Sequence, residues 1–186
     1  MSYVCHSGGA DGYDFLWGEI GKKYAINTKH YYIKGFKTPH GNTPMDVINS
    51  KDVNSYLKDV SKRLNRTYPT KSEYVNNLLK RNIFQIKFSD VVYAITESSK
   101  KENDNVIFSG GTAWAIEMAR KSRSRKIYVY DHINDVLWFF DNHVNKWLEI
   151  DDIPIIESEN FAGIGSRKSN KMGENFIREV YKNTFK

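Results

Sequence analysis

The sequence predicts a single α/β domain of the Rossmann-like, three-layer kind, with a mainly parallel central sheet. Apolar segments of strand length alternate with longer segments whose apolar residues recur at helical spacing, which is typical of this class. Three of the strand-like segments run into short turns rich in glycine and small residues, and a helix follows each turn. The chain contains no internal repeat, low-complexity tract or linker, so one domain over residues 1–186 is expected.

Strands are expected where short runs of apolar, β-branched and aromatic residues occur. Asp90–Thr96 is almost continuously apolar, as expected for a strand buried on both faces. Two runs in the last third of the chain predict either a hairpin or one edge strand with an excursion, and Ile153–Ile156 is an apolar approach to the last glycine turn. The other expected strands and the two hairpin runs are Ser2–His6, Thr28–Ile33, Val106–Phe108, Lys126–Tyr130, Val136–Phe140 and Lys146–Ile150.

Helices are expected where apolar residues recur every three or four positions. The segment after the first glycine turn, for example, places Tyr13, Leu16, Trp17 and Ile20 at this spacing. The expected helices are Asp11–Ala25, Ser50–Arg66, Lys71–Phe88, Ala113–Lys121 and Asn170–Tyr181.

Two stretches are expected to be loops. Lys34–Pro44 holds two glycines and two prolines, so it has little tendency to form regular structure. Long ordered loops of this kind are often functional. Ser98–Asn105 is polar and charged, which is typical of a surface loop.

The composition favours anionic partners. The formal net charge is +6 and the pI about 9.2, which suits nucleotides, phosphates or nucleic acid, although a mildly basic surface has the same composition. Cys5 is the one cysteine, so no internal disulfide forms and a cytoplasmic setting is expected. No signal peptide, membrane-length apolar run or metal-ligand spacing is present, and neither a metal, a cofactor nor a membrane partner is expected.

The three glycine turns are the main functional signal. In a parallel sheet the strand-to-helix turns share one edge, outside the carboxyl ends of the strands, where ligands bind. Backbone N–H groups in such turns form a cradle for phosphate, although each turn alone is also compatible with a purely structural role. The turns are Ser7-Gly8-Gly9-Ala10, Ser109-Gly110-Gly111-Thr112 and Gly163-Ile164-Gly165-Ser166.

Side chains near these turns extend the prediction of a nucleotide site. Ser166 and Arg167 are expected to contact phosphate, because a hydroxyl and a guanidinium fork both donate to its oxygens. Asp14 is expected either to hold a ribose hydroxyl or to be a first-turn acid favoured by the helix dipole. Trp114 is expected either to stack on a base or to pack in the core.

The three turns together resemble the signature loops of the SLOG superfamily. This group of Rossmann-like nucleotide binders includes the cytokinin-activating phosphoribohydrolases and the DNA-processing protein A family. The resemblance covers the strand ends around the expected site and leaves out roughly residues 34–88. The motifs that carry it are Ser7-Gly8-Gly9-Ala10-x-Gly12-x-Asp14, Gly110-Gly111-Thr112-Ala113-x-Ala115-x-Glu117 and Ala162-Gly163-Ile164-Gly165-Ser166-Arg167.

The order of the motifs differs from that in the superfamily. There the Gly-x-Gly-Ser-Arg strand opens the domain, whereas here it closes it, so the resemblance implies a circular permutation. Permutation preserves packing when the termini lie close together. The resemblance therefore implies that the C-terminal strand is central, between the Ser2–His6 and Asp90–Thr96 strands, and that residues 45–88 are a helical insertion.

The resemblance also supplies candidate catalytic residues. Counted from the paired glycines, Glu117 matches the glutamate that serves N-glycosidic cleavage in the phosphoribohydrolases. With Asp14 it forms the candidate catalytic pair. The alternative is that Glu117 is an exposed helix residue that pairs with Lys121.

The sequence therefore leads to a nucleotide or a nucleotide-derived small molecule as the expected ligand. The protein is expected to sense or sequester it, as some SLOG domains are thought to do in bacterial immunity and phage conflict, a setting that suits a phage-encoded protein, or to hydrolyse its N-glycosidic bond. The rival is a nucleic-acid-binding protein of the DNA-processing type, using the basic cluster Arg120–Lys126. The resemblance further implies a homodimer, because relatives pair through helices beside the site.

Overall fold

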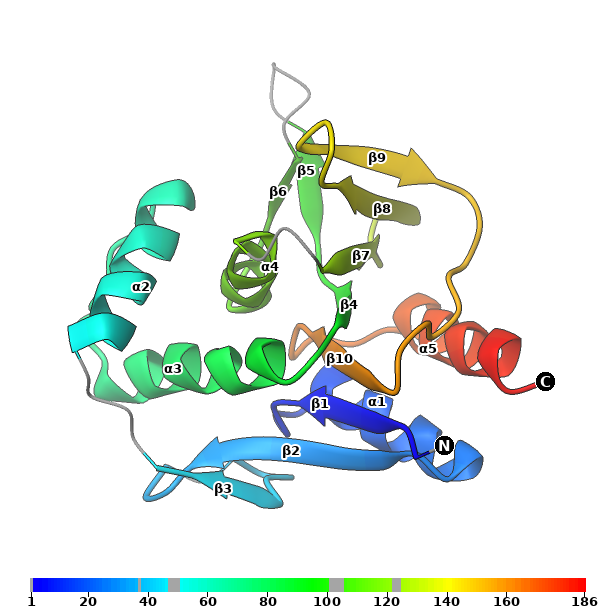
Figure 1. Ribbon diagram of the computed structural model, residues 1–186, viewed down its shortest axis with the longest axis horizontal. Coiled ribbons are helices and arrows are strands. Elements are labelled where there is room, and N and C mark those ends of the chain that lie inside the picture. Colours follow the sequence, from blue (N-terminus) through cyan, green and yellow to red (C-terminus); the bar gives the residue numbers. More distant parts are fainter. Residues whose placement is uncertain (1, 37, 47–50, 101–105, 122–124) are drawn as a thin grey trace.

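A computed structural model of the protein describes residues 2–36, 38–46, 51–100, 106–121 and 125–186. Their main feature is an eight-stranded sheet with strand order β3-β2-β1-β10-β4-β7-β8-β9 (Figure 1). The strands are β1 (Val4–Ser7), β2 (Asn27–Ile33), β3 (Thr43–Met45), β4 (Val91–Ile95), β7 (Lys126–Asp131), β8 (Val136–Asp141), β9 (Lys146–Ile150) and β10 (Asn160–Gly165). The helices are α1 (Tyr13–Gly21), α2 (Lys51–Arg63), α3 (Glu73–Lys87), α4 (Thr112–Arg120) and α5 (Lys171–Thr184).

The predicted α/β class and mainly parallel sheet are confirmed. The pairings from β3 through to β7 are all parallel, and β7, β8 and β9 continue antiparallel. The two runs near the end of the chain thus form a hairpin, with Phe139 opposite Leu148.

The last strand is central, as expected. β10 pairs on one side with β1, where Cys5 lies opposite Phe161, and on the other with β4, where Tyr93 lies opposite Gly163. β10 therefore joins two sets of strands that do not otherwise touch in the sheet.

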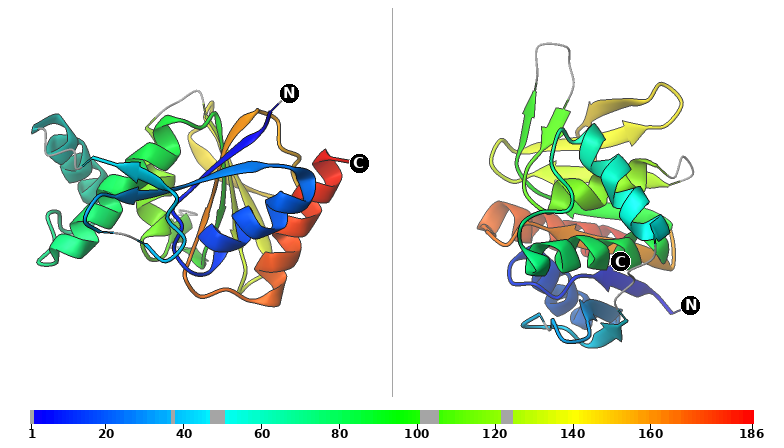
Figure 2. Two further views of the ribbon diagram at one scale, coloured as in Figure 1. Left: turned by 90° about the horizontal axis from the view of Figure 1, so that it is seen from below. Right: turned by 90° about the vertical axis from the view of Figure 1, so that its left-hand side faces the viewer.

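Helices cover both faces of the sheet and give three layers (Figure 2). One hydrophobic cluster combines α1 and α5 with one face, and a second combines α2, α3 and α4 with the other. Alternate residues of β10 serve the two clusters: Phe161 packs on the α1 side, whereas Ala162 and Ile164 pack on the α3 side. This period of two is what a strand buried on both faces requires.

Several boundaries differ from those expected. The chain at Ile153–Ile156 contains no strand, and Gly163 and Gly165 lie within β10 rather than in a turn. The turn follows them at Ser166–Lys168. Both glycines accommodate aromatic residues of α1, because an added Cβ would lie 2.6 Å from Trp17 at Gly163 and 2.5 Å from Tyr13 at Gly165.

Short strands occur in both stretches expected to be loops. β3 takes up the end of Lys34–Pro44 and pairs with β2 at the sheet edge, where a proline is tolerated. β5 (Ser98–Lys100) pairs antiparallel with β6 (Val106–Phe108) in a separate two-stranded ribbon. The rest of the second expected loop, residues 101–105, lies outside the described residues.

Candidate functional site

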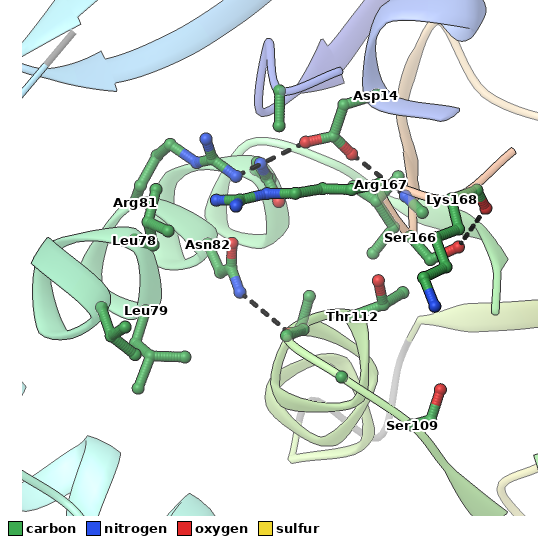
Figure 3. Close-up of a pocket in the computed structure, with 18 of the residues that line it drawn as sticks. Asp14, Leu78, Leu79, Arg81, Asn82, Ser109, Thr112, Ser166, Arg167 and Lys168 are labelled. Atoms are coloured by element: carbon green, nitrogen blue, oxygen red, sulfur yellow. Dashed lines mark hydrogen bonds and ion pairs between the residues drawn. The ribbon is translucent and has the colours of Figure 1, made fainter. Parts of the chain in front are cut away.

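A cavity of about 460 Å³ lies at the carboxyl end of β10, between α3 and the start of α4 (Figure 3). This volume is in the range of small-molecule sites. Its position follows from the topology. The helix after β10 covers one face of the sheet, whereas α4, the next helix after β4, covers the other. Such a reversal between adjacent strands opens a crevice at their carboxyl ends, where open α/β sheets bind ligands.

The cavity brings together parts of all three predicted motifs. The first motif contributes Ala10 and Asp14, the second contributes Ser109–Thr112, and the third contributes Gly165, Ser166 and Arg167. The second motif does not follow a strand of the main sheet, as was expected. It follows β6, which belongs to the small two-stranded ribbon. The remaining lining residues are Val75, Leu78, Leu79, Arg81, Asn82, Gln85, Glu97, Ala115, Ile164 and Lys168.

Four residues expected to bind phosphate lie outside this lining and support the surrounding structure. Ser7 donates its hydroxyl to the carbonyl of Asp14 at 3.0 Å. Gly8 leaves room for buried side chains, because a Cβ there would lie 2.3 Å from an Asp14 oxygen. Gly9 has a φ of +62° and packs against the His30 side chain, and Gly163 lies under Trp17.

Asp14 is the buried anchor of the site. Its Oδ1 accepts the N–H of Gly165 at 3.0 Å, and its Oδ2 accepts from Nη2 of Arg81 at 3.4 Å. Burial raises the pKa of this carboxyl above its usual value, while Arg81 and the N–H of Gly165 oppose that shift. Asp14 thus ties α1 to the end of β10, and its carboxylate is already engaged by protein donors.

Arg81 brings unpaired donors to the cavity. Its Nε and Nη1 are buried and have no hydrogen-bond partner among the described residues, and the same holds for Nε2 of Gln85. Leaving a buried donor unpaired costs about 1–3 kcal/mol, so an acceptor that reached these atoms from the adjoining cavity would stabilise the site. Arg81 and Gln85 lie one helical turn apart on α3, which places both on one side of the helix.

The second glycine turn exposes the start of α4. Gly111 is the N-cap of α4 and makes no side-chain cap hydrogen bond. A Cβ added to Gly110 or Gly111 would meet no heavy atom within 4 Å, so neither glycine is required by packing. Asn82 of α3 donates to the Gly111 carbonyl at 3.3 Å and fixes this turn against α3. A ligand can therefore approach the backbone of the turn closely.

The turn after β10 supplies exposed positive charge beside the cavity. Arg167 and Lys168 are exposed, and Nη2 of Arg167 donates to the Tyr74 hydroxyl at 3.4 Å. Ser166 donates its hydroxyl to the Lys168 carbonyl at 2.8 Å, so it shapes the turn as well as lining the cavity. The lining has three cationic and two acidic side chains, a formal excess of one positive charge.

Two predicted residues lie away from the cavity. Trp114 is buried in the core, where its ring meets that of Tyr68 edge-on at 6.2 Å, so its core interpretation is the one that the geometry favours. No aromatic side chain lines the cavity within the described part of the chain. Glu117 is also buried and outside the lining.

The partners of Glu117 differ from those expected. Its Oε2 accepts from Arg120 at 2.9 Å and its Oε1 from Arg63 of α2 at 3.4 Å. Lys121, the expected partner, instead pairs with Asp59. Glu117 thus joins α4 to α2 as a buried, charge-paired residue.

We expect Glu117→Gln to weaken folding rather than ligand binding. The amide keeps the shape but loses two charge-assisted contacts, which lowers the free energy of unfolding by about 1–3 kcal/mol. Urea denaturation measures this loss, and titration of any bound nucleotide is expected to give an unchanged Kd. A variant that remains stable but loses ligand binding or turnover would instead show that Glu117 acts in the site.

The sequence did not indicate that residues of α3, or Glu97 beyond β4, line the cavity. Arg81, Asn82 and Gln85 belong to the helix expected at Lys71–Phe88. Polar residues on the buried side of a helix are unusual and could have indicated a site. Glu97 lines the cavity two residues beyond the end of β4, and its carboxylate has no partner within the described part of the chain. Its position at the carboxyl end of a central strand could have indicated it.

Other features bear on partners. Among the described residues no group of three or more His, Cys, Asp or Glu side chains is arranged to hold a metal ion, and no helix is long and apolar enough to cross a membrane. Four of the seven residues in the basic cluster Arg120–Lys126 can be placed, since residues 122–124 lie outside the described ranges. Of those placed, Arg120 is paired with Glu117, and Nε of Arg125 donates to the Ser89 carbonyl.

Comparisons of this chain with protein-family models, with curated proteins and with solved structures found no match. The function is therefore inferred from the geometry and chemistry of the site.

Proposed function

We propose that this protein binds a nucleotide or a nucleotide-derived small molecule in the cavity at the carboxyl end of β10. One observation carries the proposal: three segments far apart in sequence line a single cavity with an uncapped helix start and unpaired arginine donors. Helix starts and guanidinium groups are the main protein features that bind phosphate.

The cavity also has a surface suited to a base. Val75, Leu78 and Leu79 form an aliphatic wall on α3, and Ile164 of β10 and Ala115 of α4 complete the apolar part of the lining. A flat heterocycle buries apolar area against such a wall, which replaces the stacking role expected of Trp114.

The proposal includes the superfamily resemblance. Two observations support it: β10 has the central position that a circularly permuted SLOG domain would need, and parts of all three motifs that carry the resemblance line the cavity. In this reading α2 and α3 belong to the inserted segment, and α3 has become a wall of the site.

We favour sensing or sequestering over N-glycosidic hydrolysis. A catalytic carboxylate must reach the scissile bond, whereas Glu117 is held by two arginines outside the cavity lining, and Asp14 is bound by Gly165 and Arg81. If the protein does hydrolyse its ligand, Glu97 is the carboxylate placed to take part.

Thermal denaturation with a panel of nucleotides tests the proposal. Nucleoside mono- and diphosphates, cyclic nucleotides and ADP-ribose derivatives are each added at millimolar concentration. At least one is expected to raise Tm, because a ligand at 100 times its Kd stabilises the folded state by about 2.7 kcal/mol. Arg178→Gln, a surface change on α5, is the control for Arg167→Gln, which is expected to reduce the shift.

A gel-shift assay with DNA and RNA separates this function from nucleic-acid binding. Strong, salt-sensitive retention of DNA or RNA in a gel, with no nucleotide that raises Tm, would contradict the proposal and support the DNA-processing alternative.

A further inference from the structure

Two sets of hydrogen-bond donors line the cavity, one beside α3 and one at the start of α4. The arginine subsite consists of Arg81, Gln85 and Arg167. The helix subsite consists of Gly110, Gly111, Thr112 and Lys168. Figure 3 shows the side chains of Arg81 and Arg167 approaching each other beside Asp14, while Lys168 extends toward Thr112 at the start of α4.

The arginine subsite holds more positive charge than its protein partners neutralise. Asp14 is the acidic partner of Arg81, at 3.4 Å, and it occupies one of the guanidinium nitrogens. The second cation, Arg167, makes a neutral contact with the Tyr74 hydroxyl. Two guanidinium groups thus share one buried carboxylate, and Nε and Nη1 of Arg81 remain without partners among the described residues.

An anion between the two arginines would correct this imbalance. Its oxygens would accept from one of the two unpaired nitrogens of Arg81, Nε or Nη1, and from the guanidinium of Arg167, in charge-assisted hydrogen bonds. Arg167 is exposed, and its one described side-chain hydrogen bond is the 3.4 Å contact to Tyr74, so it can move to admit the anion at little cost.

The helix subsite recognises an anion by different means. Here the donors are backbone N–H groups at the start of a nine-residue helix, in a turn whose two glycines face open space. The hydroxyls of Ser109 and Thr112 and the ammonium of Lys168 line the same wall. The turn after β10 supplies one cation to each subsite, but the other donors come from α3 in one and from the start of α4 in the other.

We propose that each subsite binds an anionic group of the same ligand, so that the ligand is a nucleotide carrying two separate anionic groups. This inference depends on the proposed function for the nucleotide part, but the two anion subsites themselves follow from the donors alone.

Titration of the ¹⁵N-labelled protein with inorganic phosphate tests the two subsites. Two sets of NMR signals are expected to shift with separate midpoints: the side-chain Nε–H signals of Arg81 and Arg167, and the backbone amides of Gly110–Thr112. Arg167→Gln is expected to weaken phosphate binding at the first set about tenfold or more and to leave the second unchanged, because charge-assisted hydrogen bonds are lost at one subsite only. Arg178→Gln is expected to change neither set.

A nucleoside monophosphate is then added to the phosphate-saturated protein. It is expected to displace phosphate from one subsite and leave the other occupied. A single set of shifted signals in the phosphate titration, or a monophosphate that clears both subsites, would overturn the inference. If no nucleotide displaces phosphate from either subsite, the proposed function fails, whereas two independent phosphate sites would still stand.

Discussion

Replacement of Gly163 by alanine is expected to lower the free energy of unfolding by about 3 kcal/mol, the upper part of the range for overpacked cores. Its Cβ would lie 2.6 Å from Cγ and Cδ2 of Trp17 and 2.9 Å from the sulfur of Cys5. All three residues are buried, and Gly163 is in the middle of the central strand. At an unobstructed strand position, replacing glycine by alanine raises the free energy of unfolding. Contact with Trp17 makes the same replacement lower it here.

Gly111→Ala provides the matched control. Gly111 has a φ of −71°, which alanine adopts readily, and no heavy atom lies within 4 Å of the position of its Cβ. Urea denaturation is expected to place this variant within about 0.5 kcal/mol of the native protein, while its added methyl group weakens anion binding at the start of α4. Equal stability of the two alanine variants would contradict the packing that we describe around β10.

Replacement of Arg81 by methionine is expected to cost about 3–5 kcal/mol, because it leaves the Asp14 carboxylate buried without its charged partner. The double variant Asp14→Asn/Arg81→Met is expected to recover most of this loss, since the asparagine oxygen still accepts the N–H of Gly165. Chemical denaturation of the single and double variants measures both effects. A double variant no more stable than Arg81→Met would show that Arg81 acts through packing rather than through its charge.

The pH dependence of the Arg81→Met variant has a defined sign. Burial already raises the pKa of Asp14 in the native protein, and loss of Arg81 raises it further. Between the pKa of the unfolded chain and this raised value, the folded state holds a proton that the unfolded state does not. Its stability deficit relative to the native protein is therefore expected to shrink as pH falls through this raised pKa toward the pKa of the unfolded carboxyl, by at most about 1.4 kcal/mol per pH unit.

The sequence predicts the order of the sheet better than the composition of the site. Helical spacing and apolar runs locate the elements because burial imposes those periods. The position of the last strand between β1 and β4 was implied only by the superfamily resemblance of the Gly163–Arg167 motif. The glycines themselves are ambiguous, since the sequence does not distinguish a glycine beneath an aromatic ring from one beside a ligand. Gly163 is of the first kind, whereas Gly111 lines the cavity with no heavy atom near the position of its Cβ.

The missed residues depend on packing between elements distant in the chain. Arg81 belongs to the site because α3 lies beside α4, where Asn82 reaches the Gly111 carbonyl. The sequence around residues 81–85 does not show that α3 packs beside α4. The position of Glu117 has the same cause: its spacing from the paired glycines matches a catalytic motif, but α2 supplies Arg63, which turns the carboxylate to a structural use.

The central position of β10 determines when the sheet can be completed during synthesis. A growing chain first makes β3-β2-β1 on one side and β4-β7-β8-β9 on the other, and these two groups share no backbone ladder until Asn160–Gly165 emerges. Pairings such as Val4 with Asn160 are among the most non-local that the chain makes, and contacts of this kind form late in folding. The crevice at the carboxyl end of β10 therefore cannot form until Asn160–Gly165 has been synthesised and has joined the two half-sheets.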